Sequence, residues 1–279
     1  MKREIGISIS RPVENVFSCG LFDCIEYDIG ANFDLPTAFE DWEANTKNIK
    51  ELCKKYKVRL HSYHLPFNGE RLQGHYMHEP ASLDKAVRDK TFEQTKRLIE
   101  NIADMGMRFV ILHGSLRVQE EERSQIVDYF VEYVQRLCDF CKPYGIVVAV
   151  ETLLESCIGG GGDVPENRID EHRYIITNVK RDNVGICLDN NHFIKSDSIE
   201  FVKELGEYIV TTHFSDYDGV AERHAMPGCG ITDWKRLTSL LEEKGYSGPW
   251  MFEIGFSQRG NPSDAELEEL ICRWNDIMN

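Results

Sequence analysis

The sequence has 279 residues, of which 42% are hydrophobic and 28% are charged, and its formal net charge is −15. This is an ordinary globular composition, so collagen-like, low-complexity and wholly disordered chains are excluded. The length fits either two average domains or one α/β barrel. A negative surface repels phosphate backbones and anionic lipid, so we expect a small-molecule partner, with no nucleic acid and no membrane.

The start of the chain does not have the pattern of a secretory signal. Glu4 stands where a signal peptide carries only positive charge, and no long apolar stretch follows it. The nine cysteines are an odd number without a disulfide framework, and the spacing of Cys138 and Cys141 fits core positions better than a metal or redox pair. We therefore predict reduced thiols and a cytoplasmic protein.

Short β-branched runs alternate along the chain with stretches of helical period. The expected strands are Ile5–Ile9, Cys24–Asp28, Val58–His64, Phe109–His113, Ile146–Glu151, Val184–Asp189, Ile209–His213 and Pro249–Ile254. The expected helices are Pro36–Tyr56, a segment from an N-cap at Ser82 to Ile102, Glu120–Cys141, Glu166–Val179, Ser198–Leu205, Asp233–Lys244 and Ser263–Ile277.

Every strand but the first is followed by a helix, and no linker or change of composition divides the chain. This alternation favours a single (β/α)8 TIM barrel over residues 1–279, rather than an open doubly wound sheet.

Charged and imidazole side chains stand at the carboxyl ends of six expected strands. In a barrel these ends meet at one mouth, where active sites are built. Buried together without a partner, three carboxylates and three imidazoles would be costly to desolvate, so a divalent cation is the economical partner. The six residues are His64, His113, Glu151, Asp189, His213 and Glu253.

The order of the strand-end motifs resembles a known family. The motifs are Val150-Glu151-Thr152, Leu188-Asp189-Asn190-Asn191-His192, Thr212-His213-Phe214-Ser215-Asp216, Met226-Pro227-Gly228-Cys229-Gly230 and Phe252-Glu253-Ile254. Together they resemble the xylose isomerase-like TIM barrels, which include sugar-phosphate isomerases and epimerases, ketose 3-epimerases and the endonuclease IV group.

The resemblance implies one divalent metal ion, Mn, Mg, Co or Zn, held by Glu151, Asp189, His213 and Glu253. It also implies that Glu151 and Glu253 are the catalytic acid and base. The residue types agree, because three carboxylates and one imidazole make an oxygen-rich site for such an ion. A metal there polarises a carbonyl, and a carboxylate in reach can remove the neighbouring proton to give an enediolate.

Other polar residues near the mouth are candidates for binding a small sugar or sugar derivative. His192 follows Asp189 closely and could contact a hydroxyl group, whereas Glu26 fits this role and a plain rim position equally well. The full set of substrate-binding candidates is Glu26, His64, His113, His192, Arg223 and His224.

The function that we predict is therefore that of a metal-dependent isomerase or epimerase of a sugar, sugar phosphate or sugar acid. The sequence is compatible with a homo-oligomer. A keto-polyol dehydratase could use the same metal and base, and a non-catalytic sugar-binding barrel is disfavoured by the two glutamates.

A metal-dependent phosphodiesterase is a further alternative. Glu222-Arg223-His224 resembles the Asp-Arg-His of endonuclease IV, so a three-metal site is compatible with the ligand count. The expected loop at residues 30–34 is short and acidic, however, and phosphate contacts need Lys and Arg. Gly159–Gly162 lacks the Lys-Ser/Thr of a phosphate-binding loop and is expected to form a flexible lid. Arg117 is expected either to meet a substrate anion or to lie on the surface.

Overall fold

A computed structural model describes residues 3–29, 42–66, 79–114, 118–164, 167–257 and 261–279. Eight parallel strands follow one another in the order β7-β6-β5-β4-β3-β2-β1-β8. The sheet closes where Phe214, just after β7, bridges Phe252 of β8. The strands are β1 (Ile5–Ile9), β2 (Cys24–Asp28), β3 (Arg59–His64), β4 (Phe109–Leu112), β5 (Val147–Glu151), β6 (Val184–Asp189), β7 (Ile209–His213) and β8 (Trp250–Phe252).

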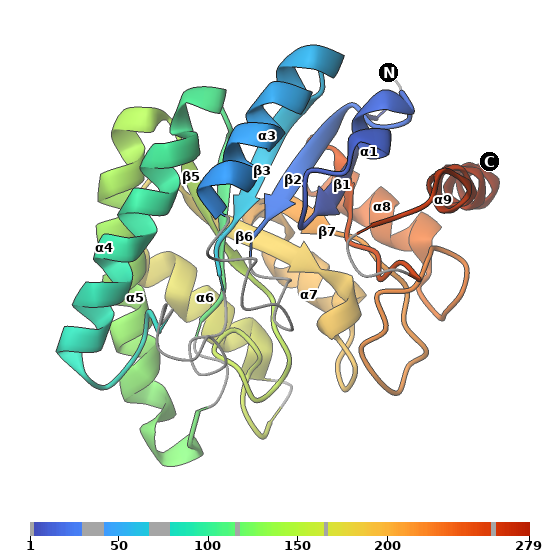
Figure 1. The fold of residues 1–279 in the computed structure, drawn as a ribbon. Coiled ribbons are helices and arrows are strands. Elements are labelled where there is room, and N and C mark those ends of the chain that lie inside the picture. The colour runs from blue at the N-terminus through green and yellow to red at the C-terminus, as the bar shows by residue number, and fades with distance from the viewer. Residues whose placement is uncertain (1–2, 30–41, 67–78, 115–117, 165–166, 258–260) are drawn as a thin grey trace.

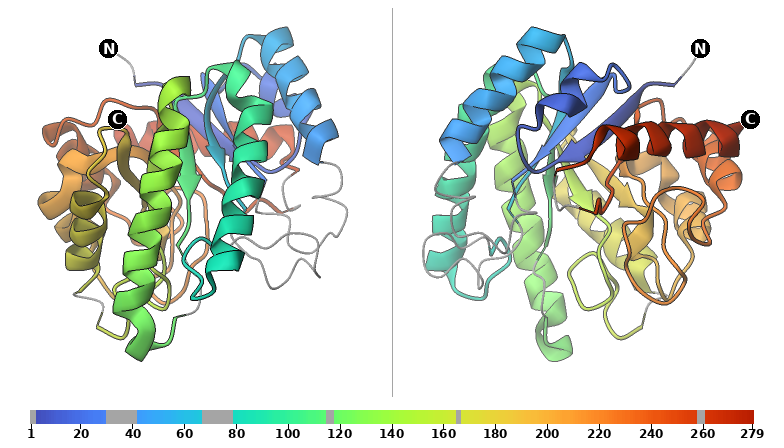
Figure 2. Two further views of the ribbon diagram at one scale, coloured as in Figure 1. Left: turned by 90° about the vertical axis from the view of Figure 1, so that its left-hand side faces the viewer. Right: turned by 45° about the vertical axis from the view of Figure 1, so that its right-hand side comes forward.

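Helices surround this sheet, as Figures 1 and 2 show, and the predicted single (β/α)8 barrel is confirmed. None of the helices within the described ranges combines the length and the apolar character needed to cross a bilayer. The α-helices are α1 (Glu14–Ser18), α3 (Trp42–Tyr56), α4 (Lys85–Ile102), α5 (Arg123–Cys141), α6 (Asn167–Val179), α7 (Ser198–Leu205), α8 (Trp234–Glu243) and α9 (Asp264–Met278). Short 3-10 turns lie at Ala103–Met105, Glu120–Glu122, Lys142–Tyr144, Asn190–His192 and Gly206–Tyr208.

Most element boundaries differ from the sequence prediction by one to three residues, and three differences bear on how the chain is arranged. The first strand does have a following helix, the five-residue α1, which lies beside α9 with Asn15 Nδ2 donating to Pro262 O at 2.8 Å. The N-cap of α4 is Asp84 rather than Ser82, because the Asp84 carboxylate accepts from the backbone N–H of Ala86. β8 is shorter than predicted. Residues 30–41, which include the start of the predicted helix Pro36–Tyr56 and the acidic loop, lie outside the described ranges, as does Arg117.

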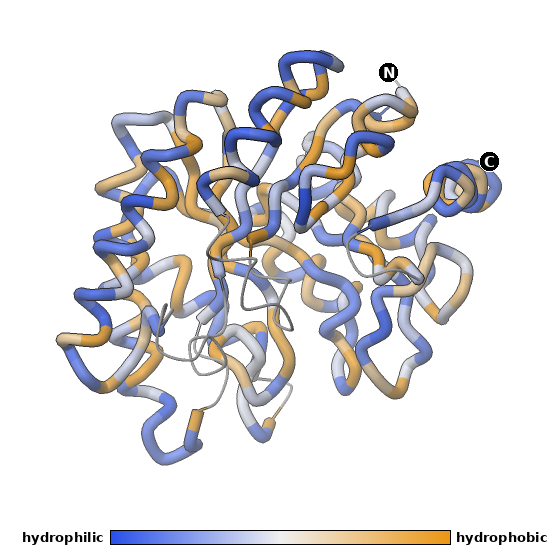
Figure 3. The backbone as a smooth tube through the Cα atoms, viewed as in Figure 1, coloured by the Kyte–Doolittle hydropathy of each residue, from blue (hydrophilic) through white to orange (hydrophobic). Residues whose placement is uncertain are grey.

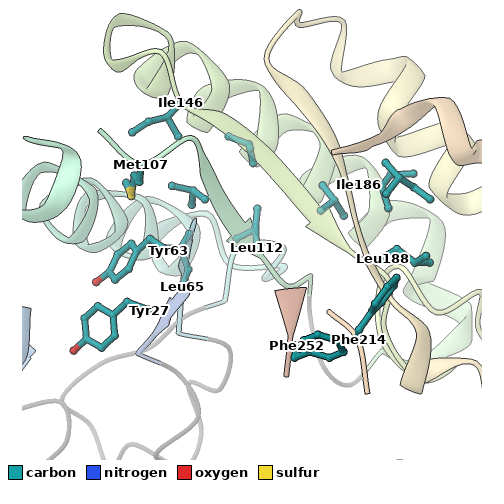
Figure 4. Close-up of a cluster of buried hydrophobic side chains, with 14 of the residues drawn as sticks. Tyr27, Tyr63, Leu65, Met107, Leu112, Ile146, Ile186, Leu188, Phe214 and Phe252 are labelled. Carbon is teal, nitrogen blue, oxygen red and sulfur yellow. The ribbon is translucent and has the colours of Figure 1, made fainter. Parts of the chain in front are cut away.

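Alternation along the strands separates an outer core from the barrel interior. Figure 3 shows hydrophobic segments on the strands and on the facing sides of the helices, and Figure 4 shows part of the core that they form. A second, smaller cluster contains Phe109, Ile111, Ala149 and Cys187, which belong to neighbouring strands. His113, Glu151 and Asp189 follow Ile111, Ala149 and Cys187 by two positions, so their side chains face the same way. The barrel interior therefore continues directly into the polar mouth.

Aromatic packing and backbone pairing stabilise the seam between β7 and β8. Phe214 N donates to Met251 O at 2.7 Å, and Glu253 N donates to Phe214 O at 3.1 Å. The Phe214 ring stacks on Trp250 at a centroid distance of 5.3 Å and also packs against Trp234 and Trp274. This seam fixes Glu253 next to His213, the last residue of β7.

All nine cysteines are free, and Cys138 and Cys141 are buried in the core, as the sequence predicted. His61 in β3 is also buried, and its Nδ1 accepts a hydrogen bond from Arg59 Nη1 at 2.9 Å. Burial and the positive charge of Arg59 lower the pKa of His61 to about 3. The folded protein therefore keeps this imidazole neutral at pH values where an unfolded chain would protonate it.

We predict that His61 contributes to acid sensitivity. Because its pKa is lower in the folded state, its stabilising contribution is present above pH 6.5 and declines as the pH falls towards 3. At pH 5 the loss relative to pH 7 should be about 2 kcal/mol. Urea unfolding with a chelator present should show that His61→Gln loses about this much less stability than wild type between pH 7 and pH 5. Equal losses in the two proteins would contradict this assignment.

Candidate active site at the barrel mouth

The carboxylate of Glu151, at the end of β5, is the centre of the polar mouth. It is almost fully buried, and its Oε2 lies 3.0 Å from His64 Nε2 and 2.8 Å from His113 Nε2. Its Oε1 lies 3.4 Å from His213 Nδ1. Burial alone would raise the pKa of Glu151, but the charges of His113 and His213 outweigh it and hold the pKa well below its usual value. Glu151 is therefore an ionised carboxylate within a ring of imidazoles.

Glu151, Asp189, His213 and Glu253 come together as the sequence predicts. One ligand-capable atom from each lies within 4.8 Å of the others. His213 Nδ1 links the two glutamates, since it is 3.1 Å from Glu253 Oε2 as well as close to Glu151. The Glu253 side chain is 26% exposed and that of Glu151 is 2% exposed, so Glu253 is the more accessible acid.

The donor set fits a divalent cation. Asp189 is completely buried, yet its Oδ2 accepts no hydrogen bond from the described part of the chain. Burial raises the pKa of Asp189 to about 6; the charges of His192 and His224 oppose this rise, and those of Glu253 and Glu151 add to it. Oδ2 lies 3.5 Å from His192 Nδ1, and a bound cation would coordinate this oxygen and offset the repulsion among the three carboxylates.

A second polar group adjoins the first. Asp189, His192 and His224 also offer ligand atoms within 4.8 Å of one another. Glu222 lies between the two histidines, with Oε1 2.8 Å from His224 Nε2 and 3.6 Å from His192 Nε2. Hydrogen bonds from these histidines hold the pKa of Glu222 below its usual value. His64, Glu151 and His213 form a third such group.

The predicted substrate-binding residues separate into two sets. His64, His113, His192 and His224 surround the carboxylate cluster, as described above. Arg223 lies outside it, since its side chain is 54% exposed and its Nε donates to Asp218 Oδ2 at 2.6 Å. Glu26 is completely buried below the mouth and contacts Ser8, Ser62 and His213.

Asp28 and Asp216 are buried carboxylates near the mouth that the sequence analysis did not select. Asp28 Oδ1 lies 3.6 Å from His64 Nδ1, and Asp28 ends β2 as the selected residues end their strands, so the same signal applied to it. Asp216 accepts backbone hydrogen bonds from Gly228, Gly230 and Thr232 at 2.9–3.1 Å, and thereby shapes the loop that follows His224.

The glycine-rich loop after β5 is packed rather than open, which differs from the expected flexible lid. Residues 157–162 are buried. A Cβ on Gly160 would lie 1.8 Å from Leu154 O, and Gly161 has a φ of +89° beside Arg168, so both positions require glycine.

Buried cations beneath this loop hold it in place. The guanidinium of Arg168, on α6, is 1% exposed, donates to Leu153 O, and donates to His192 O at 3.2 Å. It also lies over the Phe193 ring, 4.5 Å from the centroid. Arg123 donates to Cys157 O at 2.6 Å and pairs with Glu171, whose Oε1 accepts from Gly159 N at 2.7 Å. Nothing in the local pattern of α6 distinguishes Arg168 from its surface cations, so sequence reasoning missed it.

The barrel and its cluster of carboxylates and histidines define a TIM barrel with an active-site-like mouth. Residues 13–273 match the family described as xylose isomerase-like TIM barrel, and the chain belongs to that family.

Two curated relatives carry different names. Inosose isomerase of Bacillus subtilis is 26% identical over 172 residues, which cover 59% of this chain and 60% of that enzyme. A protein named probable endonuclease 4, from Ureaplasma parvum, is 24% identical over 307 residues, which cover 99% of this chain and 96% of the relative.

Solved structures share the fold over nearly the whole chain. A D-tagatose 3-epimerase-like protein has a TM-score of 0.73 with 22% identity and covers 99% of this chain and 98% of its own. The IOLI protein with a bound zinc atom has a TM-score of 0.72 with 18% identity over the same shares. At these identities the likeness establishes the fold alone.

We predict that Arg168→Met destabilises the protein by about 3 kcal/mol, because two buried carbonyl groups lose their charged donor. Arg173→Met on the same helix is the matched control. Arg173 is 41% exposed and pairs with Asp170 and Glu204 at the surface, so its loss should cost less than about 1 kcal/mol. Urea unfolding measures both variants, and equal effects would contradict a supporting role for Arg168.

Proposed function

We propose that this protein is a divalent-metal-dependent isomerase or epimerase acting on a sugar, a sugar phosphate or a sugar acid. The observation that carries the proposal is the convergence of Glu151, Asp189, His213 and Glu253 within 4.8 Å, with two glutamates among them. The names of the inosose isomerase relative and of the epimerase-like structure support a sugar ketone as the substrate class.

Each residue has a definite task in this proposal. Glu151, Asp189, His213 and Glu253 hold the ion, which when bound supplies a Lewis acid for the substrate carbonyl. Burial raises the pKa of Glu253, but the charges of His213 and His224 outweigh it and hold the pKa at about 2, so the carboxylate is ionised at neutral pH and free to accept a proton. Glu253 removes the proton next to the carbonyl, the electron pair passes to the carbonyl oxygen, and an enediolate results.

The second half of the reaction returns a proton to carbon. In an epimerase the proton is delivered to the opposite face, a task that we assign to Glu151. Glu151 is ionised in the free protein and therefore has to gain a proton before it can deliver one, and His64, whose Nε2 lies 3.0 Å away and whose pKa is raised, is the donor in reach. The proton held by Glu253 passes to solvent to close the cycle. His64, His113, His192 and His224 are assigned to the substrate hydroxyl groups, since polar pockets discriminate sugars through such contacts. Arg223 remains a candidate from the rim of the mouth.

Metal binding gives the first test. We predict one tightly bound divalent ion per chain by elemental analysis, and a stabilisation of about 2.7 kcal/mol at a free metal concentration one hundred times the dissociation constant. Asp189→Asn should strongly reduce both effects because it removes a charged ligand. Asp276→Asn, at an exposed position on α9, serves as the control and should behave like wild type. A wild-type protein with no affinity for divalent metals would overturn the proposal.

Proton exchange gives the second test. Wild type should incorporate solvent deuterium next to the carbonyl of an accepted substrate from a panel of inososes, ketohexoses and their phosphates. Glu253→Gln should slow this exchange by about 100-fold or more, because the amide keeps the shape but cannot accept the proton. Glu200→Gln, at an exposed position on α7, should leave it unchanged. Exchange at the wild-type rate in Glu253→Gln would exclude Glu253 as the base. Product analysis in the same assay separates epimerisation from dehydration.

A second candidate is an endonuclease 4-like phosphodiesterase. Glu222 with His192 and His224, next to the main cluster, provides ligands for further ions, and the Ureaplasma parvum relative covers nearly the whole chain. The net charge of −15 disfavours a polyanionic substrate. Three metal ions per chain and metal-dependent cleavage of abasic DNA, without exchange on any sugar, would favour this candidate.

A further inference from the structure

Glu26 occupies a closed pocket beneath the mouth, and its surroundings differ from those of a substrate-binding residue. Its side chain is 0% exposed. Ser8 Oγ donates to Oε1 at 2.9 Å, and Ser62 Oγ donates to Oε2 at 2.7 Å. Strand pairing fixes this arrangement, because Ser8 of β1 and Ser62 of β3 are the register partners of Glu26 on its two sides.

The third contact of Glu26 is with the proposed metal ligand His213. Oε1 of Glu26 lies 2.9 Å from Nε2 of His213, while the other ring nitrogen, Nδ1, faces Glu151 and Glu253 at 3.4 and 3.1 Å. The imidazole thus lies between a buried carboxylate on one side and the carboxylates of the candidate metal site on the other. Both residues are completely buried, so no solvent competes for this contact.

We propose that Glu26 is a positioning residue that holds Nε2 of His213 as its N–H, and so directs the Nδ1 lone pair to the metal. Metal-binding histidines commonly donate their second ring N–H to a carboxylate, which fixes the tautomer and orientation of the ring and raises the basicity of the ligand. The inference rests on the metal site of the proposed function and replaces the sequence-based role of Glu26 in substrate binding.

The neighbours of Glu26 explain why it is a carboxylate. The two serine hydroxyls use part of its accepting capacity, and Oε1, which accepts from Ser8, lies at the same 2.9 Å from His213 Nε2. An amide at this position could still accept from the serines, but it would carry no charge and could present an N–H to the imidazole. Glu26→Gln therefore removes the electrostatic part of the contact while it keeps the shape of the side chain.

The experiment measures zinc affinity and the state of the His213 ring. Zinc titration against a chromophoric chelator should give a dissociation constant 10- to 100-fold weaker for Glu26→Gln than for wild type. Ser8→Ala is the matched control, since it removes a hydrogen bond to the same carboxylate but keeps the charge beside His213, and it should bind zinc nearly as wild type does. Thermal unfolding of the metal-free proteins checks that each variant folds.

A second measurement uses the zinc-loaded wild-type protein alone, so it does not depend on the folding of Glu26→Gln. Long-range ¹H–¹⁵N correlation spectra of ¹⁵N-histidine-labelled protein, assigned with His213→Gln, should show Nε2 protonated, with its proton shifted downfield by the carboxylate. Metal bound at Nε2 or a proton on Nδ1 would overturn the inference.

The outcomes for the two proposals are separable. Wild-type affinity in Glu26→Gln, or an equal loss in Ser8→Ala, would overturn the role of Glu26 while the metal site stands. A wild-type protein that binds no zinc, manganese or cobalt would overturn both proposals.

Discussion

Burial of negative charge at the carboxyl end of the barrel is the constraint on which the rest of the site depends. Glu26, Glu151 and Asp189 are almost completely removed from solvent. Such burial is tolerated only where each charge has a partner or where protonation removes it. The imidazoles stabilise the charge of Glu151 enough to depress its pKa. They do not do so for Asp189, whose pKa is raised. This imbalance identifies the place where a cation contributes most.

The same constraint explains how the surrounding loops are built. The backbone carbonyl of His192, whose ring lies in the site, accepts a hydrogen bond from Arg168 at 3.2 Å. Asp216 likewise holds the loop after His224, because its carboxylate accepts hydrogen bonds from three backbone N–H groups of residues 228–232. Both supports are single polar side chains that order a loop by hydrogen bonds to its backbone.

Strand periodicity predicted the fold and placed six polar residues at the carboxyl ends of the strands, and the resemblance to the family selected four of them. β6 and β7 have the predicted boundaries, and each ends at the residue that enters the site. The reasoning was weaker where long-range contacts decide the outcome. Glu26 follows the strand pattern like the others, but its depth and its contact with His213 depend on pairing with β1 and β3. The burial of Arg168 likewise depends on where the glycine-rich loop folds, which its own helix does not encode.

The carboxylates of the site lie at different depths from the solvent. Glu253, with 26% of its side chain exposed, faces the solvent side, whereas the Glu151 side chain is 2% exposed. In the proposed mechanism a substrate from solvent would therefore meet Glu253 first, while Glu151 lies deeper, in contact with His64 and His113. Glu26 is 0% exposed, so in our proposal its effect on the chemistry passes through His213. His213 ends β7 and Glu253 follows β8, so closure of the barrel brings together the two residues that we propose as metal ligand and base.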